Sequence, residues 1–273
     1  RPGLNLMKMI DKASEGGFKA LWTIGYDVYL SNANMDSSDA GFGNMELVII
    51  QDLFLNETAK KYGTVFLPAC TSFEKDGTFM NSERRVNRVR KAIDPMGEAK
   101  ADWEIVCEIA RAMGKGEYFP YQNTEEIWEE VRKVWKPGTG ISYARLEGGG
   151  LQWPCPSEDH PGTPMLHVST FPHGDRASFK AIPFLDALEE TNDEFPMMMI
   201  TGRHLFGFNA GTMTNRTRNL HFQPTDLLDV NPFDADRLRL VDGDKVRIRS
   251  RYGEAVLPVR ITNSVKPGDV FTT

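Results

Sequence analysis

The stretch of sequence that decides the fold is LVIIQDLFLNETAKKYGTVFLP, residues 47–68. It holds two continuous apolar runs, residues 47–50 and 64–67, and a third run lies upstream at residues 20–24. Strands that are apolar at every position, rather than at alternate ones, are typical of parallel strands buried on both faces. The sequence therefore predicts a parallel α/β sheet, with a short helix over residues 53–62 between its second and third strands.

Candidate ligand-binding residues stand where these runs end. Gly25 follows the first run, Asp52 follows the second, and a loop follows Pro68 after the third. Ligands of open α/β sheets bind at the carboxyl ends of the strands. The Asp52 carboxylate can accept two N–H bonds from the edge of a guanine, or it can cap the helix that is predicted to begin at Leu53. These two roles are compatible, and both stay open.

Helices and then short strands are predicted for the rest of the chain. Apolar residues at helical spacing indicate helices over residues 102–113 and 123–135, with Asp102 and Asn123 as candidate N-caps, and the Gly- and Pro-rich residues 148–164 indicate a loop. The last third predicts a strand at residues 197–200, a short helix after Asn231-Pro232, a hairpin of residues 246–249 and 255–261, and a further strand opening after Gly268. Such short strands with one inserted helix favour a small β-barrel. Because the chain stops on a new strand, we expect it to be a piece of a longer protein.

Composition excludes several classes of protein. The 273 residues include 32 Lys+Arg and 38 Asp+Glu, a net charge of −6, which gives no electrostatic footprint for nucleic-acid binding. No apolar run is long enough to predict a membrane span. Three separated cysteines and five histidines without metal spacing predict neither a disulfide framework nor a metal site, and they fit a reducing compartment. Walker, GxGxxG, GxSxG and HExxH motifs are absent, and no pair of side chains stands out as a general acid and base.

A second candidate site is the loop TGRHLFGFNAGTMTNR, residues 201–216. Residues 195–225 contain no Asp or Glu, and their basic side chains are Arg203, His204, Arg216, Arg218 and His221. Glycines let backbone amides approach a ligand, and hydroxyls and guanidinium groups complete a cradle for an anion. The alternative is a basic surface loop with glycine turns.

A third segment, residues 74–86 (EKDGTFMNSERRV), is less informative. Gly77 permits a positive φ, and Glu83-Arg84-Arg85 form a short charge cluster. Such a cluster usually indicates a solvated loop with local ion pairs.

Six segments occur together in a recognisable order. They are residues 47–58 (LVIIQDLFLNET), 65–85 (VFLPACTSFEKDGTFMNSERR), 101–103 (ADW), 201–214 (TGRHLFGFNAGTMT), 231–253 (NPFDADRLRLVDGDKVRIRSRYG) and 265–268 (VKPG). In this series the chain resembles the molybdopterin oxidoreductase family, and within it the catalytic (alpha) subunit of formate dehydrogenases. The resemblance covers nearly the whole chain.

The resemblance implies a cofactor and a domain plan. The family binds molybdenum or tungsten through two molybdopterin guanine dinucleotides, the bis-MGD cofactor. By this likeness residues 1–95 are the second half of a split, Rossmann-like bis-MGD-binding domain, and residues 96–186 are a helical and irregular interdomain region. Residues 187–273 are then a double-psi β-barrel that binds molybdopterin dinucleotide and is incomplete at its C-terminus.

The resemblance also implies roles for single residues. Asp52 matches the aspartate that reads a guanine, with Asn56 beside it. Gly25, Gly77 and Asp102 match positions near the same dinucleotide, although Gly25-Tyr26-Asp27 departs from the Gly-Glu-Asn-Pro of many relatives. The residues that match the loop around pterin and phosphates are Thr201, Gly202, Arg203, His204, Gly207, Phe208, Asn209, Thr212 and Thr214.

The remaining implications concern parts outside this chain. The cysteines of a 4Fe-4S cluster, the Cys or selenocysteine ligand of the metal and the residues that act on formate lie upstream in relatives. We therefore expect the upstream polypeptide and electron-transfer subunits as partners, formate as substrate, carbon dioxide as product, and a cytoplasmic location. The alternatives are a nitrate reductase or hydratase of the same family, or a non-catalytic scaffold homologue in a respiratory NADH dehydrogenase.

Overall fold

The computed structural model describes residues 3–187 and 189–273, which divide into two compact units. One unit contains the described residues of the ranges 1–14, 27–40 and 181–273. The other contains residues 15–26 and 41–180. Each unit is described by itself.

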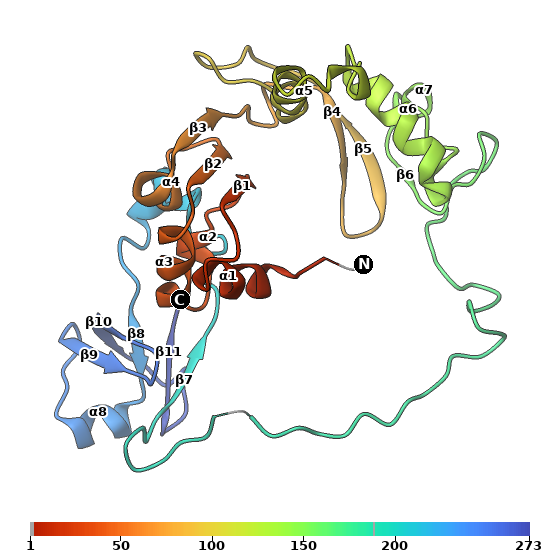
Figure 1. The fold of residues 1–273 in the computed structure, drawn as a ribbon. Helices are drawn as coiled ribbons and strands as arrows, with labels where there is room; N and C mark the ends of the chain where they lie inside the picture. Colours follow the sequence, from red (N-terminus) through yellow and green to blue (C-terminus); the bar gives the residue numbers. More distant parts are fainter. Residues whose placement is uncertain (1–2, 188) are drawn as a thin grey trace. The chain divides into compact units, whose positions relative to one another are not determined.

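A three-stranded parallel sheet carries the strands that the sequence predicts. Its strands are β1 (Ala20–Ile24), β2 (Leu47–Asp52) and β3 (Val65–Pro68), with β2 in the centre (Figure 1). Val48 and Ile50 on one face of β2 and Gln51 on the other face are fully buried, whereas the edge strands expose Ile24 and Val65. The parallel sheet is thus confirmed, but burial on both faces holds only for β2, because β1 and β3 each have one open edge among the described strands.

In chain order, one helix precedes these strands, two short helices follow β1, and one helix follows β2. These elements are α1 (Leu6–Ser14), α2 (Val28–Ser31), α3 (Met35–Gly43) and α4 (Glu57–Tyr62). The helix predicted from Leu53 begins only at Glu57, because the side chain of Asn56 accepts a hydrogen bond from the Ala59 amide and acts as the N-cap. Asp52 is therefore not the cap of this helix, and that interpretation was wrong.

The segment expected to be a solvated loop is a β-hairpin. Strands β4 (Gly77–Met80) and β5 (Arg85–Val89) pair antiparallel, and β6 (Leu151–Gln152) adds to β5. Only Val86 of this hairpin is fully buried, so its strand pattern is hidden behind charged side chains. The local ion pair is confirmed, since Arg85 Nε lies 2.8 Å from Glu83 Oε1.

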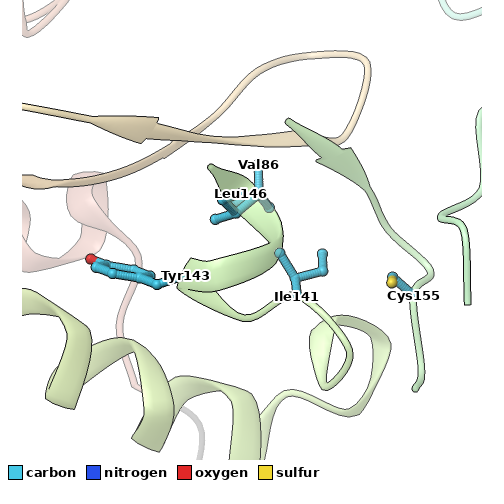
Figure 2. Close-up of a cluster of buried hydrophobic side chains, with 5 residues drawn as sticks. All are labelled: Val86, Ile141, Tyr143, Leu146 and Cys155. Carbon is cyan, nitrogen blue, oxygen red and sulfur yellow. The ribbon is translucent and has the colours of Figure 1, made fainter. Parts of the chain in front are cut away.

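Three helices follow the hairpin in the chain, and residues of α6 and α7 pack against it. The helices are α5 (Asp102–Ala112), α6 (Thr124–Val134) and α7 (Tyr143–Leu146), with single 3₁₀ turns at Gly116–Tyr118 and Lys136–Gly138. Figure 2 shows the core of this packing, in which Leu146 of α7 points toward Val86 of β5, with Ile141, Tyr143 and Cys155 beside them. Asn123 caps α6 as predicted, whereas α5 is capped at Ala101 and Asp102 is its first helical residue. Asp102 as an N-cap was therefore wrong.

The C-terminal residues form a five-stranded mixed sheet. Its order is β7-β11-β8-β10-β9, and the described strands are β7 (Met198–Thr201), β8 (Leu228–Val230), β9 (Lys245–Arg249), β10 (Glu254–Ile261) and β11 (Asp269–Thr272). Short helix α8 (Pro232–Leu238) follows β8, and 3₁₀ turns lie at Thr214–Arg216 and Arg218–His221. Leu228, Val230, Ala235, Val259 and Val270 form its core. The predicted hairpin, the helix after Asn231 and the final strand are confirmed, whereas β8 was missed because only three residues pair.

Two further features bear on the sequence predictions. Cys70, Cys107 and Cys155 are free and buried. Within residues 3–187 and 189–273, none of the helices has both the length and the apolar character needed to cross a membrane.

Candidate cofactor-binding site

Asp52 ends the central strand of the parallel sheet, and its carboxylate is half-buried. Its Oδ1 accepts a hydrogen bond from the Leu53 amide at 2.6 Å, and its Oδ2 accepts one from Asn56 Nδ2 at 2.8 Å. A carboxylate has about four lone-pair sites, so each oxygen keeps room for one further donor. Asp52 is thus oriented from inside the protein and still able to accept two N–H groups from a ligand.

Asn56 is the residue that orients Asp52. The Asn56 side chain is 2% exposed, its Nδ2 donates to Asp52, and its Oδ1 accepts from the Ala59 amide at 2.8 Å. One side chain therefore begins helix α4 and fixes the carboxylate rotamer. The structure places Asn56 beside Asp52, as predicted, with its amide engaged by the protein.

Gly25 ends the neighbouring strand at the same edge of the sheet. Its φ is +61°, a conformation that favours glycine, and a Cβ at this position would meet no atom within 4 Å. The Gly25 amide donates to the backbone oxygen of Gln51 at 2.8 Å. The backbone beside Asp52 is therefore open at Gly25, as the position of a ligand at the strand ends requires.

Gln51 links this edge to helix α5. The Gln51 side chain is fully buried, and its Nε2 donates to Asp102 Oδ1 at 2.7 Å. Lys75 donates to the other oxygen, Asp102 Oδ2. Gly77 begins β4 two residues beyond Lys75. Sequence reasoning missed Gln51 and Lys75; the available signal was a polar residue closing an apolar run directly before Asp52.

The loop between Lys75 and β3 is held by a second carboxylate. Glu74 is buried and accepts hydrogen bonds from the amides of Thr71 at 2.8 Å and Met96 at 2.9 Å, which hold the pKa of Glu74 below its usual value. Burial raises the pKa of the neighbouring Cys70 thiol, and the negative charge of Glu74 adds to this effect. The loop is thus shaped by its own hydrogen bonds.

The second candidate segment lies in the other unit and follows strand β7. Its residues are mostly exposed, and the Phe208 amide donates to Thr214 Oγ1 at 3.2 Å, which closes the loop on itself. The Arg203 guanidinium lies 6.0 Å from the centre of the Phe208 ring. Within the described residues, Arg203 makes no ion pair and no hydrogen bond. Its donors are therefore available to an anion.

Two positions of this loop require glycine because neighbouring side chains leave no space for a Cβ atom. A Cβ at Gly202 would lie 2.6 Å from the ring of Phe271, and a Cβ at Gly207 would overlap the imidazole of His204. His204 Nδ1 accepts from the Phe206 amide at 3.3 Å, so this imidazole folds back onto its own loop. Close packing of the loop explains these glycines, in addition to the ligand approach that the sequence suggested.

The two sets of residues, each taken within its own unit, offer different chemical groups to a ligand. At the sheet edge, Asp52 offers acceptors for the N–H groups of a purine, and Gly25 leaves space beside it. In the loop, Arg203, Thr212 and Thr214 offer donors for phosphate oxygens, in a region without acidic residues. The described residues hold no group of three or more His, Cys, Asp or Glu side chains arranged to bind a metal ion.

Comparison with known proteins decides the family. The Molybdopterin oxidoreductase profile matches residues 1–112, and the Molydopterin dinucleotide binding domain profile matches residues 197–273. The chain belongs to the molybdopterin oxidoreductase family. The second match contains the whole loop of residues 201–214, and the first contains the sheet edge with Gly25, Asp52, Asn56 and Asp102.

Relatives in this family include formate dehydrogenases and a nitrate reductase. The chain is 38% identical over 271 residues to the F420-dependent formate dehydrogenase subunit alpha of Methanocaldococcus jannaschii, covering 98% of the chain and 40% of the relative. It is 39% identical to the F420-dependent formate dehydrogenase 2 subunit alpha of Methanococcus maripaludis, with 98% and 40% covered. It is 34% identical to the assimilatory nitrate reductase catalytic subunit of Bacillus subtilis, with 99% and 39% covered. The chain thus spans about two fifths of the length of these relatives.

A solved structure shares the fold. Acetylene hydratase from Pelobacter acetylenicus matches with a TM-score of 0.70 at 16% identity, over 97% of this chain and 38% of that one. The mixed α/β fold class is therefore confirmed.

Proposed function

We propose that this chain is the cofactor-holding part of the catalytic (alpha) subunit of a formate dehydrogenase, which oxidises formate to carbon dioxide. The observation that carries the proposal is the similarity to formate dehydrogenase alpha subunits, 38–39% identical along 98% of the chain. The sheet edge and the loop supply the residue types that a guanine dinucleotide requires. The proposed cofactor is bis-MGD with molybdenum or tungsten.

Each residue has a holding role in this proposal. Asp52, oriented by Asn56, accepts the N–H groups of one guanine, and Gly25 and Gly77 leave space along the dinucleotide. Arg203 clamps a phosphate with two parallel N–H bonds, while Thr201, Thr212 and Thr214 add hydroxyl donors. When bound, the cofactor supplies the two-electron chemistry, and the chain binds and orients it. The C-terminal sheet is proposed to belong to a double-psi β-barrel.

The rest of the proposal concerns the longer protein. Residues 1–95, 96–186 and 187–273 are the proposed domain portions, and the upstream polypeptide is proposed to hold the metal ligand and a 4Fe-4S cluster. Electrons then pass to partner subunits in the cytoplasm. These assignments rest on the family resemblance.

A nitrate reductase is the second candidate. The 34% identity to the Bacillus subtilis assimilatory nitrate reductase extends over 99% of the chain, so the same holding residues suit either substrate. The non-catalytic scaffold is disfavoured, because a scaffold does not need the acid-free loop with its unpaired Arg203.

The test uses the full-length protein that contains this chain, purified without oxygen. Acid hydrolysis of the released cofactor should yield guanine nucleotide and pterin, with molybdenum or tungsten detected by mass spectrometry. Formate should reduce a viologen dye, and nitrate should not oxidise the reduced dye. Nitrate turnover without formate turnover selects the nitrate reductase, and a protein purified without pterin or metal overturns both candidates.

A further inference from the structure

The side chains of Gln51, Lys75 and Asp102 form a cluster whose members come from three separate segments. Gln51 lies in the central strand β2, Lys75 in the loop before β4, and Asp102 in the first turn of α5. Gln51 and Lys75 each donate to one of the two carboxylate oxygens of Asp102. One carboxylate therefore joins the end of the sheet to the segment that leads into Gly77.

Gln51 is an unusual residue near the end of the central strand. Its side chain is fully buried, yet within the described part of the chain its Oε1 has no hydrogen-bond partner. An apolar side chain of similar size would avoid this unmade bond, and unsatisfied buried polar groups call for a reason beyond packing. The bond from Nε2 to Asp102 is the one interaction that an apolar residue could not provide.

The backbone near the cluster is held by other bonds. The Lys100 amide donates to the Pro68 oxygen at 3.1 Å, and the Cys70 amide donates to the Lys100 oxygen at 2.9 Å. Glu74 independently fixes the loop through the amides of Thr71 and Met96. Loss of the Lys75–Asp102 pair should therefore leave the fold intact and loosen only the segment around Lys75.

We propose that Gln51 and Lys75 are positioning residues, which act through Asp102 to hold the segments 51–56 and 74–79 in one fixed arrangement. This inference rests on the proposed function, because these segments carry Asp52 and Gly77, the residues assigned to the dinucleotide. Fixing both segments before the ligand arrives removes the entropic cost of ordering them during binding. Asp102 then connects the two segments and does not itself contact the guanine base.

The first measurement is hydrogen–deuterium exchange on the cofactor-free full-length protein. Lys75→Met and Asp102→Asn should each speed exchange of residues 75–79 by about threefold to tenfold, a modest factor because both side chains are partly exposed. The double variant should match either single variant, because Lys75 acts only through Asp102. Lys100→Met is the matched control, since Lys100 also pairs with a carboxylate of α5, Glu108, at 2.7 Å, and it should change nothing.

The second measurement is cofactor retention together with the melting temperature. Gln51→Leu should keep or raise the melting temperature, because it removes the buried Oε1 atom that has no hydrogen-bond partner. The same variant should contain less metal and pterin per chain. Lys75→Arg should restore the retention that Lys75→Met loses. A purely structural Gln51 would instead lower the melting temperature and leave the content of the folded fraction unchanged.

The outcomes separate this inference from the proposed function. Unchanged exchange in Lys75→Met and Asp102→Asn, additive effects in the double variant, or an equal effect of Lys100→Met overturns the positioning role, whatever the protein binds. Retention lost in Asp102→Asn but kept in Lys75→Met also overturns it and makes Asp102 a direct ligand. A wild-type protein without any pterin overturns the proposed function. In that case the exchange data still show whether Gln51 and Lys75 act through Asp102.

Discussion

Replacing Asp52 by alanine tests the candidate site most directly. Each carboxylate oxygen already accepts one internal hydrogen bond, from Leu53 and from Asn56, and each has one lone pair left for a ligand. Two charge-assisted hydrogen bonds to a ligand, at about 1.5–3 kcal/mol each, would contribute at most about 3–6 kcal/mol to the binding free energy of the dinucleotide. Because the carboxylate is only half-buried, we expect the low end, about 3 kcal/mol, or roughly a hundredfold weaker retention of the dinucleotide.

The assay compares wild-type and Asp52→Ala full-length protein after gel filtration. Metal and guanine nucleotide per chain should both fall in the variant. On dilution, the variant should lose its bound cofactor before the wild-type protein does. The fold should survive, because Asn56 keeps its bond to the Ala59 amide and still caps α4. A melting temperature within a few degrees of wild type is therefore part of the expected result.

Asn56→Thr is the matched comparison. Threonine keeps an oxygen that can cap α4, but it removes the donor that orients Asp52. We expect dinucleotide retention to weaken by about threefold to tenfold, because one hydrogen bond of about 1 kcal/mol fixes the rotamer of Asp52. This effect lies between those of the wild-type protein and Asp52→Ala. If Asp52→Ala retains its full cofactor content, the sheet edge does not read a base and the assignment of Asp52 is refuted.

Three further predictions concern the loop, the C-terminal sheet and the response to acid. Arg203→Lys should lose more cofactor than Arg218→Lys, because lysine cannot make two parallel N–H bonds; equal losses, measured as metal per chain, would leave only a diffuse basic patch. Arg260→Met should lower the free energy of unfolding in urea by about 2–3 kcal/mol, because it strands the buried carboxylate of Asp229, whereas exposed Arg247→Met should change it by less than about 0.5 kcal/mol. Because the pKa of Glu74 is lower in the folded protein than in the unfolded chain, the ionised carboxylate stabilises the fold at pH values above its unfolded pKa. This stabilisation disappears as the pH falls through the lower folded pKa. Glu74→Gln should therefore flatten the acid side of the stability curve, and an unchanged curve would contradict the role given to the Thr71 and Met96 amides.

Elements with a strong apolar pattern were predictable from the sequence. The runs at residues 20–24, 47–50 and 64–67 became β1, β2 and β3, because short runs rich in β-branched and other apolar residues, bounded by turn residues, favour strands. The hairpin of β9 and β10 was equally clear, since Tyr252-Gly253 separates two short runs of β-favouring residues. In these segments local pattern and tertiary packing agree.

The hairpin of β4 and β5 shows where such patterns fail. Its strands contain Arg85, Asn87 and Arg88, and only Val86 is deeply buried. Arg88 nevertheless packs its guanidinium 3.8 Å from the centre of the Tyr143 ring, so a charged residue provides packing that a sequence pattern counts as solvent exposure. Arg84 likewise donates to the backbone oxygens of Trp153, Thr163 and Pro164, which are distant in sequence.

The candidate site divides in the same way. Asp52 and the acid-free loop stand out in the sequence because of their position and charge. Gln51 and Lys75 do not, because their partner Asp102 lies 51 and 27 residues away, and no local spacing indicates that these three side chains meet. Residues that contact a ligand can be proposed from the strand ends, whereas residues that position them emerge only once the chain is folded.

The same division separates the two levels of the proposed function. We propose that the assigned residues hold a cofactor, and a cofactor common to formate dehydrogenases and nitrate reductases would need the same holding groups in both. This explains why relatives with different substrates match the chain at 38% and 34% identity over nearly its whole length. Substrate choice depends on groups that touch the substrate, so Asp52→Ala and Arg203→Lys should lower formate and nitrate activities by the same factor in whichever enzyme carries this chain. A variant that changed one activity without changing cofactor content would show that this chain also lines the substrate pocket.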